Sequence, residues 1–211
     1  MGGRGASAGG FAGGGGIGAN PRETTSLVSA REGKRAEVDQ ALGVARDVQD
    51  RYGIDADVND WQIARFGKPT GVMAYYDSNG NLAINESFFD GAKMNAAYDA
   101  CVKDGYHPSR GDKTGIEAVT AHELGHRLTD YIGVKTGMGD WQVDKVSSDI
   151  VRKAATRLGY KRAGDMASKI SGYASQNPAE AVAEAFADVY CNGSKARRES
   201  QAIVTELNRY F

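Results

Sequence analysis

The sequence predicts an α+β domain that is rich in helix and carries a small β-sheet or hairpin. Asn79-Gly80 lies in a turn between two short apolar runs, residues 71–77 and 82–85, which is typical of a β-hairpin. Most of the remaining chain spaces its apolar residues at the helical period. With 211 residues, 41% of them apolar, the chain is long enough for one sizeable core but hardly for two.

Each helix is predicted from its own run of apolar spacing and its end signals. In chain order, the predicted helices cover residues 24–53, 88–103, 115–128, 141–158, 162–170, 177–191 and 197–211. The hairpin lies between the first two of them. We therefore expect one helix-rich domain over residues 23–211.

Residues 1–22 differ from the rest of the chain because ten of the 28 glycines lie there. Such a composition cannot bury a core, and we expect a disordered or flexible leader.

Composition excludes several classes of function. The net charge of −1 gives no sign of nucleic-acid binding. Cys101 and Cys191 lack zinc-finger spacing and indicate buried or free thiols in a reducing compartment. No apolar run is long enough for a membrane helix, and no signal-peptide core is present. We expect a cytoplasmic protein, with no membrane partner.

The most informative motif is His122-Glu123-Leu124-Gly125-His126. Residues four apart lie on one face of a helix, so both imidazoles can reach one metal ion, and Glu123 can act on the water at an open metal position. Thr114 and Glu117 have capping-box spacing ahead of the apolar run, which favours a helix here. Gly125 leaves room beside the metal, where a larger side chain would crowd a neighbouring element.

A catalytic zinc needs a third protein ligand. His107 lies in a turn-rich stretch, and a surface or structural role is expected for it. Asp130 follows His126 by four residues and could face the metal, but it lies near the helix end. The metzincin class is excluded because Thr129 and Ile132 stand where that class needs a glycine and a ligand.

A stronger candidate lies on the helix that Asn177 and Pro178 begin. Glu180, Glu184 and Asp188 repeat every four residues and form an acidic stripe on an otherwise apolar helix. Glu180 also stands three residues after Asn177, so it has an alternative explanation as the glutamate of a capping box.

These residues together resemble the gluzincin zinc peptidases. Tyr173, Glu180 and the segment 183–186 look like the catalytic domain of anthrax toxin lethal factor and its relatives. The resemblance covers roughly residues 70–190 and implies a zincin-like metalloprotease fold. It makes Glu180 the third zinc ligand beside His122 and His126.

The same resemblance makes Tyr173 the residue that stabilises the oxyanion, and Glu184 a carboxylate that orients a ligand histidine. A competing register remains, because Glu184 and Asp188 have the Glu-x-x-x-Asp spacing found in thermolysin-like gluzincins, where the glutamate binds zinc.

The resulting hypothesis is a zinc-dependent metalloendopeptidase that cleaves a protein substrate with Glu123 as general base. The hairpin fits the edge strand on which zincin-like folds bind an extended peptide.

The glycine-rich leader resembles small phage and prophage proteins of the minor-head type, which implies phage-particle partners, or a toxin delivered into a target cell. Two alternatives stay open: a phage structural or interaction protein with a non-catalytic metal site, and a regulatory peptidase that cleaves a repressor.

Overall fold

The computed structural model describes residues 6–8, 21–66, 71–76, 81–137 and 143–211. In this part of the chain, helices pack around a mixed β-sheet, so the α+β prediction is confirmed. The strands are β1 (Ala6–Ala8), β2 (Pro21–Ser26), β3 (Gln62–Phe66), β4 (Val72–Tyr76) and β5 (Leu82–Asn85), and their order in the sheet is β1-β4-β5-β3-β2.

The pairing of β4 with β5 is antiparallel, with Tyr75 opposite Ala83. This confirms the two predicted strands of the hairpin, while residues 77–80 of its turn lie outside the described residues. The pairing of β3 with β5 is parallel, and β2 adds to the far side of β3. On the other side of the sheet, β1 pairs antiparallel with β4, and Ala6 lies opposite Tyr75.

Helices make up most of the described chain, and several short 3₁₀ turns accompany them. The α-helices are α1 (Arg35–Tyr52), α2 (Gly91–Lys103), α3 (Gly115–Lys135), α4 (Val143–Arg157), α5 (Ala163–Ala167), α6 (Pro178–Asn192) and α7 (Arg198–Leu207). The 3₁₀ turns are η1 (Ser29–Glu32), η2 (Val58–Asp60), η4 (Gly193–Lys195) and η5 (Asn208–Tyr210). Within the described residues, no helix is long and apolar enough to cross a membrane.

The predicted helix over residues 24–53 was wrong at its beginning. The segment Pro21–Ser26 is β2, and the helix starts only at Arg35. Thr24 and Thr25 are β-branched and suit a strand, and they pair with Ala64 and Ile63 of β3. β1 and the start of β2 also lie within the predicted glycine-rich leader.

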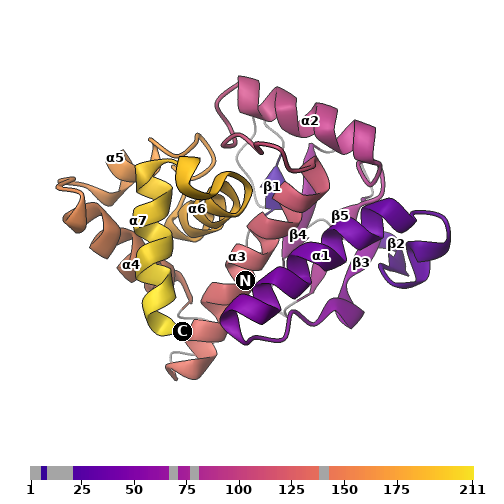
Figure 1. The fold of residues 1–211 in the computed structure, drawn as a ribbon, viewed down its shortest axis with the longest axis horizontal. Helices are drawn as coiled ribbons and strands as arrows, with labels where there is room; N and C mark the ends of the chain where they lie inside the picture. The colour runs from indigo at the N-terminus through magenta and orange to yellow at the C-terminus, as the bar shows by residue number, and fades with distance from the viewer. Residues whose placement is uncertain (1–5, 9–20, 67–70, 77–80, 138–142) are drawn as a thin grey trace.

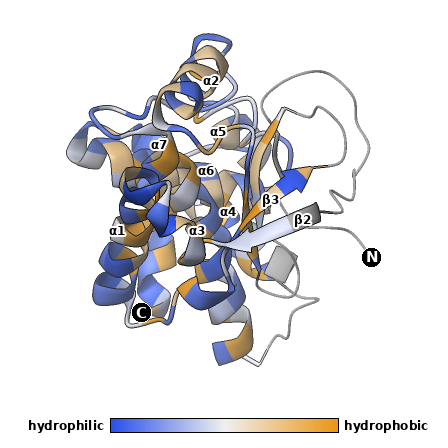
Figure 2. Ribbon diagram, turned by 90° about the vertical axis from the view of Figure 1, so that its right-hand side faces the viewer, coloured by the Kyte–Doolittle hydropathy of each residue, from blue (hydrophilic) through white to orange (hydrophobic). Residues whose placement is uncertain are grey.

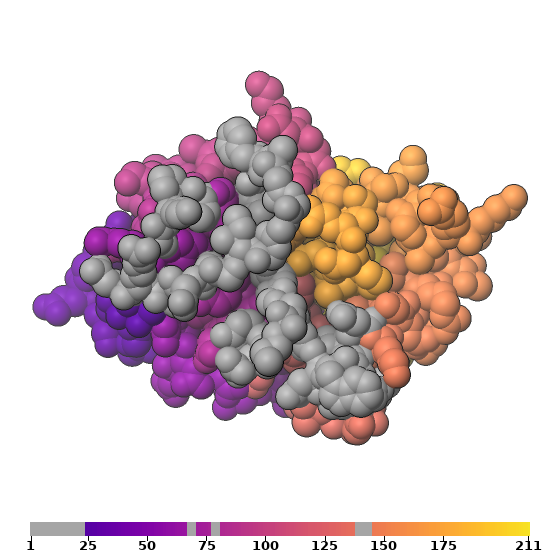
Figure 3. All heavy atoms as spheres, turned by 180° about the vertical axis from the view of Figure 1, so that it is seen from behind, coloured from indigo at the N-terminus to yellow at the C-terminus, as the bar shows by residue number. Residues whose placement is uncertain are grey.

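Helix α3 runs through the middle of the molecule (Figure 1). It packs against α1, α2 and β4 on one side and against α4 and α6 on the other. The space-filling view from behind shows the same division, with the earlier part of the chain and the last helices on opposite sides (Figure 3). The long central helix is therefore in a position to hold residues that both halves of the chain contact.

The ribbon coloured by hydropathy shows hydrophobic residues on strand β3 and on the helices beside the sheet (Figure 2). One core cluster joins Leu27, the inner faces of β4 and β5, and helices α1 to α7. A smaller cluster of Ala64, Phe66, Val72 and Ala83 covers the other face of the sheet. Cys101 is buried, Cys191 is half-buried, and both are free thiols, as predicted. The polar residues buried inside this core therefore need a specific explanation.

Candidate metal centre

The His-Glu-x-x-His segment lies in the middle of α3. Thr114 and Glu117 form the predicted capping box, in which each side chain accepts a bond from the other residue's backbone N–H. One to three turns further on, His122, Glu123 and His126 are all buried, with 3% exposure or less. Their potential ligand atoms all lie within 4.8 Å of one another, so this buried group could hold a metal ion.

Gly125 lets helix α6 approach this segment closely. A Cβ atom added at Gly125 would lie 2.7 Å from the Cα atom of Ala183 and 3.3 Å from Cβ of Phe186, both on α6. The small residue is thus needed for helix packing. The room expected beside the metal is in fact room for the backbone of α6, which carries Glu180 and Glu184.

The carboxylate of Glu180 faces both histidines of the motif. Its Oε2 lies 3.2 Å from Nε2 of His122 and 3.4 Å from Nε2 of His126. All three atoms are buried, and none of them has a hydrogen-bond partner among the described residues. Three buried ligand atoms that converge without well-formed hydrogen bonds are an arrangement that a bound cation would satisfy.

The protonation of this cluster follows from its burial and its charges. Burial raises the pKa of Glu180, but the neighbouring His126 and His122 lower it by more, so that the net pKa is about 2. Burial lowers the pKa of His122, while Glu180 and Glu184 raise it, and the net result lies well above the ordinary value. Without a cation, Glu180 is therefore ionised, and a proton on His122 compensates its charge.

The predicted acidic stripe divides into three separate contacts. The backbone N–H of Glu180 donates to Oδ1 of Asn177, which leaves the Glu180 carboxylate for the histidines. Glu184 bonds to Nδ1 of His122, at 2.8 Å, on the other side of that ring. Asp188 accepts bonds from Asn192 and from the backbone of Arg197. The structure thus places Glu180, and not Glu184, against the two Nε2 atoms.

Tyr173 lies against the ring of His122. The two rings stack with centroids 5.6 Å apart and an interplanar angle of 22°. The backbone N–H of Tyr173 donates to the carbonyl of Tyr106, which fixes the loop before α6 against the loop after α2. Burial and the nearby carboxylates, Glu180 foremost, raise the Tyr173 pKa. Its hydroxyl therefore stays protonated at any physiological pH.

Two other candidates lie differently from what was expected. His107 is only 4% exposed, so a surface position was wrong, and its Nδ1 lies 2.9 Å from Oε1 of Glu184. These two residues are 77 positions apart, and no local spacing indicated the contact. Asp130 interacts with the hydroxyl of Tyr76 and raises its pKa, although burial raises that pKa more.

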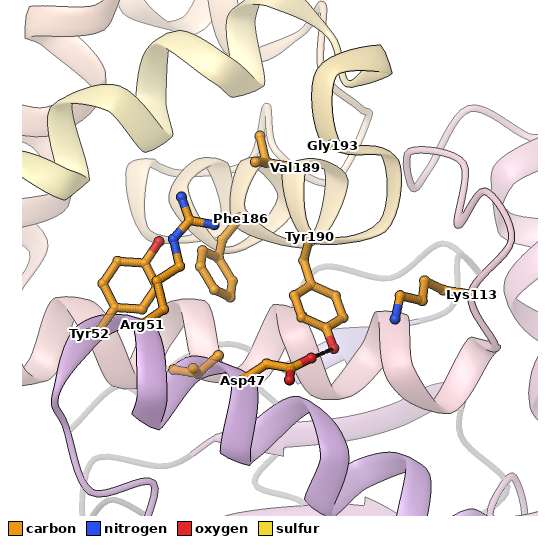
Figure 4. Close-up of a pocket in the computed structure, with 9 residues that line it drawn as sticks. Asp47, Arg51, Tyr52, Lys113, Phe186, Val189, Tyr190 and Gly193 are labelled. Atoms are coloured by element: carbon orange, nitrogen blue, oxygen red, sulfur yellow. Dashed lines mark hydrogen bonds between the residues drawn. The ribbon is translucent and has the colours of Figure 1, made fainter.

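A cavity of about 390 Å³ lies elsewhere, between α1 and α6 (Figure 4). Phe186 and Tyr190 of α6 face Asp47 and Arg51 of α1 across it. The Tyr190 hydroxyl donates a 2.7 Å hydrogen bond to Asp47. The residues that line it include no histidine and none of the buried glutamates.

In comparisons with known proteins, no family model, no curated protein and no solved structure matches this chain.

Proposed function

We propose that this chain is a zinc-dependent metalloendopeptidase of the gluzincin type, with a zincin-like domain that resembles the lethal factor catalytic domain. The observation that carries the proposal is the convergence of His122 Nε2, His126 Nε2 and Glu180 Oε2, which are buried and lack hydrogen bonds among the described residues. Two imidazoles and one carboxylate are a ligand set typical of catalytic zinc.

The ligand set also favours catalysis over a purely structural metal. Three protein ligands leave a coordination position for water or substrate, whereas structural zinc sites are closed by four. Zinc bound there would act as a Lewis acid that activates water and polarises the scissile carbonyl. A structural site would have no use for the buried carboxylate of Glu123 in the same cluster.

The proposal gives each polar residue around the site a role. Glu123 is the general base, which accepts a proton from the attacking water and then passes it to the leaving amine. Tyr173 keeps its proton, because burial and nearby carboxylates raise its pKa, and so it can donate a hydrogen bond to the developing oxyanion. Glu184 holds Nδ1 of His122, so that Nε2 of this ring faces Glu180 and would be free to hold a metal.

A peptide substrate would bind at the β4 edge of the sheet. Strand β4 contacts α3, and its last residue, Tyr76, stacks on His126 with ring centroids 6.5 Å apart. An extended peptide that adds to the β4 edge would therefore run beside the metal ligands. In the structure, β1 takes this edge of β4.

Zinc content and peptide hydrolysis test the proposal together. We expect the zinc-loaded protein to cleave peptides from a mixed library, and a chelator to abolish cleavage. Glu123→Gln should keep its zinc and lose turnover by about 10²–10⁴-fold. Glu117→Gln is the matched control, because it changes a glutamate of the same helix that contacts the cap residue Thr114 and Lys113. Undiminished hydrolysis by Glu123→Gln, or cleavage that survives zinc removal, would contradict the proposal.

A further inference from the structure

The carboxylate of Glu184 joins two histidines and a serine. Its Oε1 accepts hydrogen bonds from Nδ1 of His122, at 2.8 Å, and from Nδ1 of His107, at 2.9 Å. Its Oε2 accepts a 2.8 Å bond from the hydroxyl of Ser171. Both oxygens of the Glu184 carboxylate are therefore occupied by hydrogen bonds.

This arrangement determines where the protons of the histidines lie. A carboxylate oxygen that meets two Nδ1 atoms accepts from both of them, so Nδ1 carries the proton in each ring. The lone pair of a neutral His122 is then on Nε2, the atom that faces Glu180. Glu184 thus sets both the tautomer and the direction of the His122 ring.

His107 contributes nothing polar except its bond to Glu184. Its Nε2 is buried and has no hydrogen-bond partner among the described residues. Its ring stacks on Tyr98 with centroids 5.2 Å apart, and meets Tyr106 and Tyr173 edge-on at 5.1 and 5.6 Å. These aromatic contacts fix the ring, so the Nδ1–H is held in one place against Glu184.

We propose that His107 is a positioning residue of the metal site, which acts on His122 through Glu184. The inference rests on the proposed function, since it concerns the geometry of the same site. A carboxylate held by His122 and Ser171 alone could tilt about the line between those two bonds. The second N–H on Oε1 opposes this tilt and keeps Oε1 in line with Nδ1 of His122. Groups that support a ligand in this way contribute about 10–100-fold to metal affinity.

Two substitutions separate the hydrogen bond from the packing. His107→Asn keeps an N–H donor at about the position of Nδ1 but removes the ring, whereas His107→Phe keeps the ring but removes the donor. We expect His107→Phe to weaken zinc binding about 10–100-fold, and His107→Asn to stay within a few-fold of wild type. Zinc affinity is measured by competition with a chromophoric chelator, without any activity assay.

A matched control and a double variant complete the test. Tyr106→Phe loses the hydroxyl bonded by Gln176 but keeps the ring beside His107, so zinc affinity should not change. In a Glu184→Gln background, His107→Phe should have little further effect, because the two residues act in series. If His107→Asn does not fold, the comparison of His107→Phe in the wild-type and Glu184→Gln backgrounds still tests the proposal.

The outcomes distinguish this inference from the proposed function. Wild type that binds no zinc overturns the proposed function. Wild type that binds zinc, with an equal affinity in His107→Phe, overturns only the role of His107. A loss in His107→Asn that matches or exceeds the loss in His107→Phe also overturns it, because the ring and not the donor would then matter.

Discussion

The contact between α3 and α6 at Gly125 gives a sharp prediction about how the site is built. Gly125→Ala puts a Cβ atom 2.7 Å from the Cα atom of Ala183, whereas ordinary contacts begin near 3.4 Å. The backbone of α6 must therefore move by about 0.7 Å, the difference between these distances. Ala183 lies between Glu180 and Glu184, so the same movement displaces both carboxylates from the histidines.

Two opposing terms set the magnitude. Overpacking of this kind costs about 1–3 kcal/mol. Alanine is better than glycine in a helix interior by about 1 kcal/mol. Gly125→Ala should thus lower the free energy of unfolding by about 0–2 kcal/mol. We also expect zinc affinity to fall by about 10–100-fold, the range for disturbed ligand support.

Gly43→Ala provides the matched control. Gly43 is inside α1, and a Cβ atom there would meet nothing within 4 Å. The Gly43→Ala variant gains the same helix propensity without the clash. In the absence of metal, this variant should be about 1 kcal/mol more stable than wild type. Because the propensity term cancels, the two variants should differ by about 1–3 kcal/mol, or about 2–12 °C in Tm by calorimetry. Equal stabilisation in both variants, with unchanged zinc affinity in Gly125→Ala, would refute the reasoning.

Three further predictions concern the proposed chemistry. Tyr173→Phe should lower kcat by about 10²–10³-fold, as for other oxyanion donors, and leave zinc affinity unchanged; an unaltered kcat in a peptide assay would exclude this role. The pKa of His122 is raised in the metal-free protein, and zinc must displace that proton, so below this pKa zinc affinity should rise about tenfold per pH unit. The same raised pKa of His122 stabilises the metal-free protein. This stabilisation is complete below the pKa of His122 in the unfolded chain, about 6.5, and is lost as pH rises through the raised pKa. A zinc affinity or a Tm that does not change with pH would contradict this prediction. Deletion of residues 1–20 removes β1 and exposes the β4 edge, so KM for a peptide should fall while kcat stays constant; an unchanged or higher KM would exclude competition at this edge.

The two helices of the candidate site were predictable because their signals are local. Thr114 and Glu117 cap α3 as the spacing indicated, and Asn177 with Pro178 begins α6. Once both helices exist, the helical period places residues four apart on one face. The candidate ligands could therefore be named from the sequence, but only the packing of α6 on α3 brings Glu180 rather than Glu184 to the Nε2 atoms.

What the sequence did not reveal depends on contacts between distant residues. His107 reaches Glu184 across 77 positions, from an irregular loop whose composition resembles many others. The helical pattern was expected to begin near Thr24, yet pairing with β3 makes residues 24–26 a strand. In both cases a tertiary partner decides the outcome, and a periodic pattern contains no information about that partner.

The identity of the third ligand is the central claim, and zinc stoichiometry tests it most directly. Elemental analysis after dialysis would compare wild type with Glu180→Ala and Glu184→Ala. The account predicts one zinc per chain in wild type, loss of zinc in Glu180→Ala, and retained but weaker binding in Glu184→Ala. Zinc that is retained in Glu180→Ala but lost in Glu184→Ala, or no zinc in wild type, would contradict it.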